Sequence, residues 1–197
     1  MAEKLDTCIR REQIAEAALL VAADEGLGGV TVKKVAARVG LTPSGLYRHY
    51  KNKSEILAAV LNWVHLRFQA NIDDACAESD QALDILHGIM VHNLKTIRRY
   101  RILPLFFLSS IIWNGEPHLA RHIRANFRHS LGRIAQILAH GQRIGQVRPD
   151  ADPQCLAVTF IGAYAMPAML HARDLVDADL DRLVETNWLL LREALTP

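Results

Sequence analysis

Residues 31–55 combine residue types that suit contact with a nucleic acid. Thr42, Ser44 and Gly45 stand at the start of a short predicted helix, and they are small or polar enough to meet base edges inside a groove about 12 Å wide. The residues that follow carry groups able to meet phosphates: Tyr47, His49, Lys51 and Lys53. This order of residue types indicates a helix that enters a groove while its flanks hold the backbone.

The charge is distributed unevenly along the chain. Residues 26–54 contain six Lys or Arg and no acidic residue, whereas residues 149–197 contain three Arg against eight Asp or Glu, so the total is only +2. A basic block is a possible footprint for a polyanion, although on charge alone a solvated surface is the commoner explanation. Both readings stay open for Arg38, and Tyr47 could alternatively be a core residue, although the phosphate contact is favoured.

Two short helices position these residues. Thr31 is a good N-cap for the first helix, whose apolar face is expected to pack through Val32, Val35, Ala36 and Val39 until Gly40 ends it. Thr42 caps the second helix, with Pro43 at its first position and Leu46 on its packing side. This pattern is typical of a helix-turn-helix. A third helix begins near Lys53, where free N–H groups and the helix dipole favour anions.

The rest of the chain shows helical periodicity, with no sustained alternation of apolar and polar residues. The prediction is therefore an all-α, nine-helix architecture, with residues 1–55 as an N-terminal helix-turn-helix domain and residues 56–197 as a helical body. The expected helices cover residues 11–25, 32–39, 43–49, 53–77, 80–99, 103–113, 117–144, 153–172 and 177–195.

Composition excludes several other classes of protein. Half of the 197 residues are apolar and 22% are charged, which argues against disorder and allows a sizeable core. No stretch approaches the roughly 20 uninterrupted apolar residues of a membrane span, and no signal peptide is evident at the start. Three widely spaced cysteines suit reduced thiols in a cytoplasm. Because no catalytic motif such as GxSxG, HExxH, CxxC or a P-loop occurs, we expect neither an enzyme nor a metal or cofactor.

The run GVTVKKVAARVGLTPSGLYRHYKNKSEIL, a first helix with Ile14, Ala18 and Val21, and the nine-helix plan together resemble the TetR (tetracycline repressor) family of bacterial regulators. The resemblance implies a ligand-responsive regulator that binds a palindromic operator in double-stranded DNA as a homodimer. It implies that the DNA-facing residues are Lys33, Thr42, Pro43, Ser44, Gly45, Tyr47, Arg48, His49 and Lys53. Gly45 departs from the usual pattern, because it offers no side chain at a position that often reads a base.

The resemblance also divides the body into an effector pocket and a dimer interface. The effector is expected to be a small apolar or amphipathic molecule, since pockets between helices are mostly apolar. Candidate pocket residues are Trp63, His87, Met90, Phe106, Phe107, Trp113, Phe127, Phe160 and Tyr164, with His65, His92 and Asn93 as further polar groups. Candidate dimer residues on the last two helices are Leu156, Phe160, Leu180, Leu183, Val184, Trp188 and Leu191.

Three readings of function remain from the sequence. The leading one is a repressor that a small effector releases from its operator. A transcriptional activator, or a DNA-binding protein controlled by a protein partner, is the alternative. A helical carrier or enzyme with an accidental basic patch is the remote one.

Overall fold

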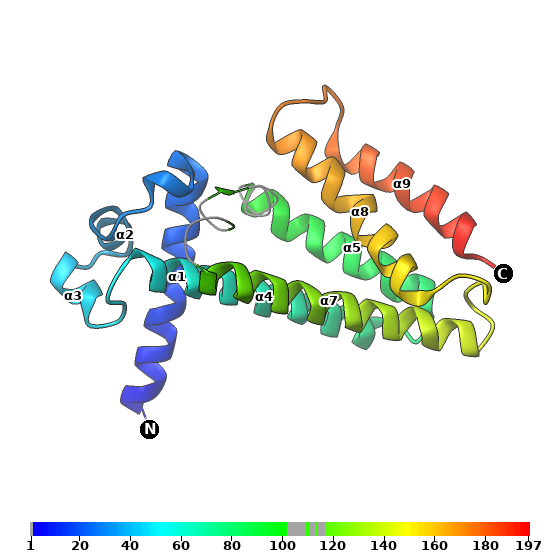
Figure 1. Ribbon diagram of the computed structural model, residues 1–197, viewed down its shortest axis with the longest axis horizontal. Coiled ribbons are helices and arrows are strands. Elements are labelled where there is room, and N and C mark those ends of the chain that lie inside the picture. The colour runs from blue at the N-terminus through cyan, green and yellow to red at the C-terminus, as the bar shows by residue number, and fades with distance from the viewer. Residues whose placement is uncertain (1, 102–108, 111–112, 114–116) are drawn as a thin grey trace. The chain divides into compact units, whose positions relative to one another are not determined.

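The computed structural model describes residues 2–101, 109–110, 113 and 117–197, with side chains from residue 9 onward. Every regular element in this part of the chain is a helix, so the all-α prediction is confirmed (Figure 1). The expected helix over 103–113 falls almost entirely outside the described residues. The helices are α1 (Ala2–Gly29), α2 (Val32–Val39), α3 (Pro43–Tyr47), α4 (Lys53–Glu78), α5 (Ala82–Arg99), α7 (Pro117–Arg143), α8 (Pro153–Ala172) and α9 (Leu180–Leu195).

The chain forms two compact units. The first runs to Arg67 and includes Tyr100–Asn126, and the second consists of Phe68–Arg99 and Phe127–Pro197. The first unit thus extends to residue 67, inside α4. Ile56 and Val60, in the first turns of α4, are buried in this unit.

Helix α1 supplies much of the core of the first unit. Ile14, Ala18 and Val21 are almost fully buried, as expected for the apolar face of an amphipathic helix. Gly26 interrupts the helix with φ 74° and ψ 169°, directly after the predicted end of this helix at residue 25. A backbone of this kind is open mainly to glycine, because it lacks a Cβ.

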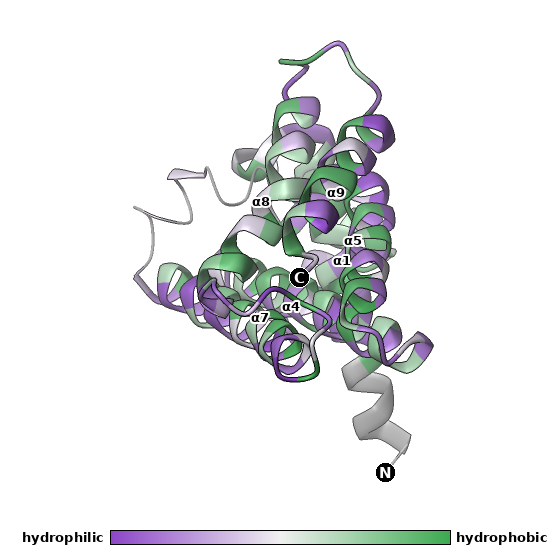
Figure 2. Ribbon diagram, turned by 90° about the vertical axis from the view of Figure 1, so that its right-hand side faces the viewer, coloured by the Kyte–Doolittle hydropathy of each residue, from purple (hydrophilic) through white to green (hydrophobic). Residues whose placement is uncertain are grey.

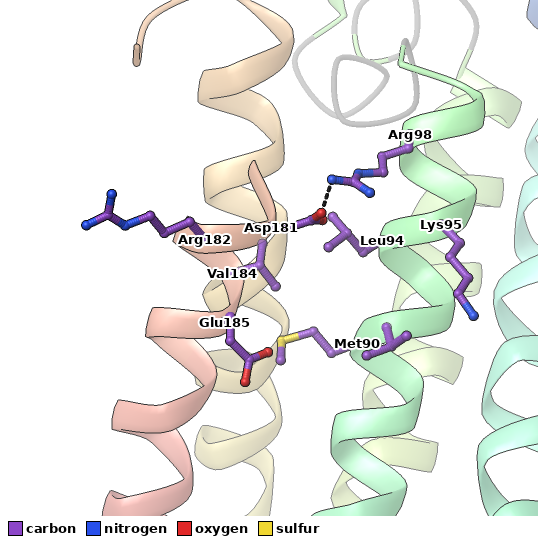
Figure 3. Close-up of a pocket in the computed structure, with 9 residues that line it drawn as sticks. Met90, Leu94, Lys95, Arg98, Asp181, Arg182, Val184 and Glu185 are labelled. Atoms are coloured by element: carbon purple, nitrogen blue, oxygen red, sulfur yellow. Dashed lines mark ion pairs between the residues drawn. The ribbon is translucent and has the colours of Figure 1, made fainter. Parts of the chain in front are cut away.

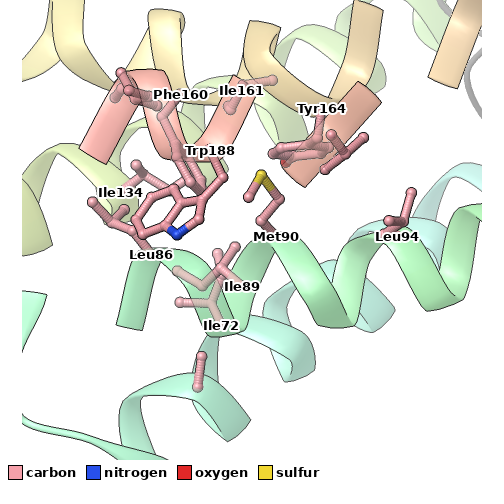
Figure 4. Close-up of a cluster of buried hydrophobic side chains, with 14 of the residues drawn as sticks. Ile72, Leu86, Ile89, Met90, Leu94, Ile134, Phe160, Ile161, Tyr164 and Trp188 are labelled. Atoms are coloured by element: carbon pink, nitrogen blue, oxygen red, sulfur yellow. The ribbon is translucent and has the colours of Figure 1, made fainter. Parts of the chain in front are cut away.

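Helices α4, α5, α7, α8 and α9 contribute to one apolar core in the second unit (Figure 4). Its largest fully buried side chains include Met90 on α5, Ile134 on α7 and Phe160 on α8. Trp188 of α9 joins them and stacks on the His87 ring, with the ring centroids 5.1 Å apart. The faces that the sequence shows as most strongly apolar therefore pack inside the protomer.

A small polar cluster lies inside this core. The Asn71 side-chain amide donates to Asn93 Oδ1 at 2.9 Å and to Thr96 Oγ1 at 3.1 Å, and the Asn93 amide donates to the Tyr164 hydroxyl at 3.0 Å. Burial raises the pKa of Tyr164 to about 12, against a smaller lowering by the Asn93 hydrogen bond. The cluster joins α4, α5 and α8 by bonds that leave its buried polar groups partnered.

Candidate functional site

Helices α2 and α3 form the helix-turn-helix predicted from the sequence. Thr31 Oγ1 accepts a hydrogen bond from the Lys34 amide at 3.3 Å, and Gly40 ends α2 in the left-handed conformation with φ 73°. Val35 and Ala36 are fully buried beneath this surface. The first helix is therefore held by its cap, its glycine stop and its apolar face.

The start of α3 is held in the same way. Thr42 Oγ1 accepts from the Gly45 amide at 3.1 Å, Pro43 stands in the first turn, and Leu46 is fully buried. A Cβ added at Gly45 would lie 3.2 Å from Thr42 Oγ1, which is a tight approach to the capping atom. The glycine thus favours an undisturbed cap, which is a structural reason for the departure noted in the sequence.

The structure brings the predicted DNA-facing residues of α3 to the outside of the first unit. Tyr47 is 53% exposed, which places it outside the core. Gly45 and His49 are partly exposed, and the remaining predicted residues around α3 are exposed: Thr42, Pro43, Ser44 and Arg48. Lys33 on α2 is exposed as well. Small and polar groups therefore surround the start of α3, with cations beside them.

Only part of the basic block is free to meet an external anion. Lys34 pairs with Glu25, and Arg38 pairs with Asp24, so the surface-face reading holds for Arg38. Within the part of the chain that the structure describes, Lys33, Arg48 and Lys51 have no side-chain ion pair. Together with Lys53, which likewise has no side-chain ion pair among the described residues, they carry the positive charge of this segment that no carboxylate neutralises.

Lys53 has a different environment from the one expected of a phosphate contact. Its ammonium donates to the Leu27 carbonyl at 3.0 Å and to the Gly28 carbonyl at 3.2 Å, after the Gly26 interruption of α1. The start of α4 is closed by a capping box, because Asn52 Oδ1 accepts from the Glu55 amide and Glu55 Oε2 accepts from the Lys51 amide, both at 2.8 Å. Lys53 therefore links the start of α4 to the end of α1 in this structure.

Tyr50 packs against α1. The residue is 3% exposed, its hydroxyl donates to the Arg11 carbonyl at 3.2 Å, and the Arg11 guanidinium lies 4.8 Å from the ring centroid. The two tyrosines near α3 therefore have opposite roles, since Tyr47 is outside and Tyr50 is inside.

The predicted effector residues do not gather around one cavity in the described part of the chain. Phe106 and Phe107 lie outside the described residues. Met90, Phe160 and Tyr164 are buried in the core of the second unit, and His87 stacks on Trp188. Trp63 packs edge-on against Tyr100 in the first unit, and Phe127 and Trp113 are exposed. For Phe160 and Tyr164, the helical aromatic spacing reflects core packing.

A groove of about 500 Å³ instead lies between α5 and α9 in the second unit (Figure 3). Met90, Leu94 and Val184 form its apolar floor, and an ion pair between Arg98 and Asp181 crosses one end. The sequence holds a signal for this site: Met90, Leu94 and Arg98 are four residues apart on one helical face, where an apolar stripe ends in a cation. Of the predicted effector residues only Met90 lines the groove.

The predicted dimer residues also differ from the surface that the structure leaves open. Five of them are at most 8% exposed and belong to the protomer's own core: Phe160, Leu180, Val184, Trp188 and Leu191. Leu156 and Leu183 are partly exposed. The strongest apolar stripe packs within the protomer because that burial removes most apolar area from water.

A second apolar face remains on the outside of α8 and α9. On α8 it contains Val158, Gly162 and Met166, which are spaced by four residues, and on α9 it contains Leu190. Val158, Met166 and Leu190 are 57%, 51% and 63% exposed. Helix α8 is also long and apolar enough to cross a membrane by length and composition, yet only 28% of its most apolar window is buried. The colouring of Figure 2 shows the apolar character of both helices.

Comparison with known proteins agrees with this geometry. Residues 14–60 match the model described as bacterial regulatory proteins, tetR family. The chain is 24% identical over 147 residues to the HTH-type transcriptional repressor KstR2 of Mycolicibacterium smegmatis, covering 73% of this chain and 70% of that protein. It is 27% identical over 194 residues to the HTH-type transcriptional regulator PksA of Bacillus subtilis, covering 93% and 88%.

A solved structure shows the same fold along nearly the whole chain. It is that of the transcriptional regulator FadR from Bacillus subtilis in complex with stearoyl-CoA, with a TM-score of 0.79 at 20% identity, covering 93% of this chain and 98% of that one. The matched segment 14–60 contains both helices of the helix-turn-helix and the buried face of α1. The helix-turn-helix segment of this chain is therefore similar to that of bacterial regulatory proteins of the tetR family.

Proposed function

We propose that this protein is a ligand-responsive transcriptional repressor that binds an operator in double-stranded DNA and acts in the cytoplasm. The observation that carries the proposal is the exposed start of α3, where small and polar residues stand beside the unpaired cations Lys33, Arg48 and Lys51. Residues of these types can meet base edges and phosphates together. The buried Val35, Ala36 and Leu46 hold this surface rigid.

The operator is expected to be palindromic, because the protein acts as a homodimer. A dimer places two recognition helices about 34–36 Å apart, or at a multiple of that distance, to read two half-sites. The second apolar face of α8 and α9 supports this proposal, since an apolar helix with most of its surface outside the protomer calls for a covering partner. Small residues such as Gly162 allow a second helix to approach closely.

The effector is a small apolar or amphipathic molecule. The names of the relatives support this class, because FadR is described in complex with stearoyl-CoA, an amphipathic thioester. The second unit has an accessible groove with an apolar floor of suitable size. The effector can change DNA occupancy only through different affinities for two states of the protein, with typical couplings of ~1–3 kcal/mol.

A gel-shift titration with the intergenic DNA upstream of the gene tests the proposal. The wild type is expected to shift this DNA, and Tyr47→Ala is expected to weaken the shift strongly because it removes an exposed phosphate donor next to α3. Leu175→Ala, which truncates a 69% exposed side chain in the second unit, is the control. A wild type that binds intergenic and unrelated DNA equally well at 150 mM salt would overturn sequence-specific recognition.

A further inference from the structure

We infer that the groove between α5 and α9 is the binding site for an amphipathic carboxylic acid, whose carboxylate replaces that of Asp181 on Arg98. The inference rests on the proposed function, because it assigns the effector a site and a chemical class. The groove volume of about 500 Å³ falls in the usual range of small-molecule pockets.

The floor of the groove provides a fixed apolar surface. Met90, Leu94 and Val184 are 9% exposed or less and belong to the core cluster of the second unit, so they do not need to be ordered when a ligand arrives. In Figure 3 the Met90 and Leu94 side chains point from α5 toward α9, where Val184 faces them. A hydrocarbon chain or ring lying here would cover these side chains.

The Arg98–Asp181 pair selects the head group. Both side chains are about half exposed, so their mutual attraction is weak. Arg98 lies in the last turn of α5 and Asp181 in the first turn of α9, where each charge is also favoured by its own helix dipole. Asp181 can therefore leave Arg98 without becoming an isolated charge, and a planar guanidinium suits another carboxylate equally well.

The other charged residues around the groove do not compete for this place. Glu185 lies 3.5 Å from His87 Nε2, so its carboxylate already has a neighbour of its own. Lys95 and Arg182 also line the groove, and Figure 3 shows their charged ends turned away from Arg98 and Asp181. Arg98 is thus the cation at the end of the apolar floor, and the site favours a molecule with one negative charge at one end of an apolar body.

Arg98 is also close in the sequence to a hydrogen bond of the first unit, through which ligand binding is expected to affect that unit. It precedes Tyr100 by two residues, and the Tyr100 hydroxyl donates to the Glu16 carboxylate on α1. A ligand that repositions the end of α5 would act on this hydrogen bond through the backbone. Binding in the groove is therefore expected to lower the affinity of the protein for its operator.

Calorimetric titration of the full chain with decanoate tests the inference, with decanol as the uncharged probe. Wild type is expected to bind decanoate more tightly than decanol. Arg98→Gln is expected to weaken decanoate binding about tenfold, the loss typical of one charge-assisted hydrogen bond, and to leave decanol unchanged. Asp181→Asn is expected to strengthen decanoate binding, because it frees Arg98. Arg192→Gln, an exposed arginine on α9 outside the groove, is the matched control.

Two results would overturn the inference: decanoate binding to Arg98→Gln with wild-type affinity, or equal affinity of the wild type for decanol and decanoate. Arg98→Gln and Asp181→Asn both change half-exposed residues and are expected to fold, which thermal unfolding verifies. The gel shift separates this inference from the proposed function. If Arg98→Gln binds both operator DNA and decanoate like the wild type, the groove is not the ligand site but the proposed function stands. If the wild type does not bind the operator DNA, the proposed function is wrong.

Discussion

Individual residues of the helix-turn-helix divide into those proposed to contact DNA and those that bond within the protein. Lys33 and Lys53 are both basic and both match the family pattern, yet Lys33 is exposed and Lys53 donates to two carbonyls. Sequence patterns record that a cation stands at a position, but they do not record its nearest acceptor. Only the folded chain distinguishes the two roles.

This distinction predicts different effects for two substitutions. Lys33→Ala is expected to reduce the salt slope of operator binding by about 1 per protomer, with stability unchanged, because it removes a phosphate contact. Lys53→Ala is expected to lower the free energy of unfolding by roughly 1 kcal/mol, because it removes bonds from a charged donor. Salt-dependent DNA titrations and urea unfolding of both variants check this. A loss of salt slope in Lys53→Ala equal to that of Lys33→Ala would contradict the assignment.

Tyr164 predicts a pH effect in the second unit. Its pKa of about 12 in the folded protein lies above the ordinary value of 10, so the folded state holds its proton over a range in which the unfolded state loses it. The contribution of Tyr164 to stability is therefore full below pH 10 and declines as the pH rises toward 12. In Tyr164→Phe this part of the pH dependence is expected to vanish.

Tyr164→Phe is also expected to destabilise the protein by about 1–3 kcal/mol at pH 7, because the buried Asn93 amide loses its acceptor. Urea unfolding of wild type and variant at pH 7, 9, 10 and 11 measures both effects. An unchanged difference between the two proteins across this series would contradict the raised pKa.

Among the elements, the caps and glycine stops of the helices were the most predictable features. Thr31, Gly40 and Thr42 all act where the sequence placed them, because capping depends on a few adjacent residues. The outward face of α8 was less predictable. Apolar residues occur all round this helix, so the pattern alone does not say which stripe faces the core.

The Gly26 interruption of α1 predicts a strong dependence on glycine. Gly26→Ala is expected to cost about 1–3 kcal/mol of stability, because a side chain is strained at φ 74° and ψ 169°. Gly28→Ala is the matched control, since a Cβ at Gly28 meets nothing within 4 Å and its φ is not positive. Thermal unfolding of the two variants compares them, and equal melting temperatures would contradict the argument.

The outward face of α8 predicts an effect on assembly. A Cβ at Gly162 would meet nothing within 4 Å in the protomer, so Gly162→Arg is expected to fold normally but to remain monomeric, because the new side chain occupies the proposed interface. Gly132→Arg on α7 also enters open space and is expected to remain a dimer. Light scattering at micromolar concentration distinguishes these outcomes. A dimeric Gly162→Arg protein would place the interface elsewhere.

For the whole molecule, the sequence predicts the helical class well. Local patterns determine the helix-turn-helix, because its residues are consecutive. The groove was not predictable in the same way, since Arg98 and Asp181 are 83 positions apart and meet only when α5 and α9 pack. A site made from distant helices depends on how those helices pack. Apolar periodicity indicates which face of a helix is buried, but not which helix covers that face.

The ion pairs also show how much of the positive charge remains for DNA. Of the six basic residues in 26–54, Lys34 and Arg38 form ion pairs and the Lys53 ammonium donates to two carbonyls. Three cations remain for the proposed phosphate contacts: Lys33, Arg48 and Lys51. About six neutralised phosphates per dimer would give a salt slope near −5 for operator binding. Titrations between 50 and 200 mM salt measure this slope, and a flat dependence would contradict the phosphate contacts.

The exposed apolar face of α8 has a further consequence for how much of the repressor is active in a cell. Pairing obeys mass action, so both the melting temperature and the fraction of chains competent for DNA should rise with total concentration. Occupancy of the operator would then increase with the square of the free chain concentration while the chains are mostly single. A gene under such control would switch over a narrower range of repressor abundance than one read by a single chain.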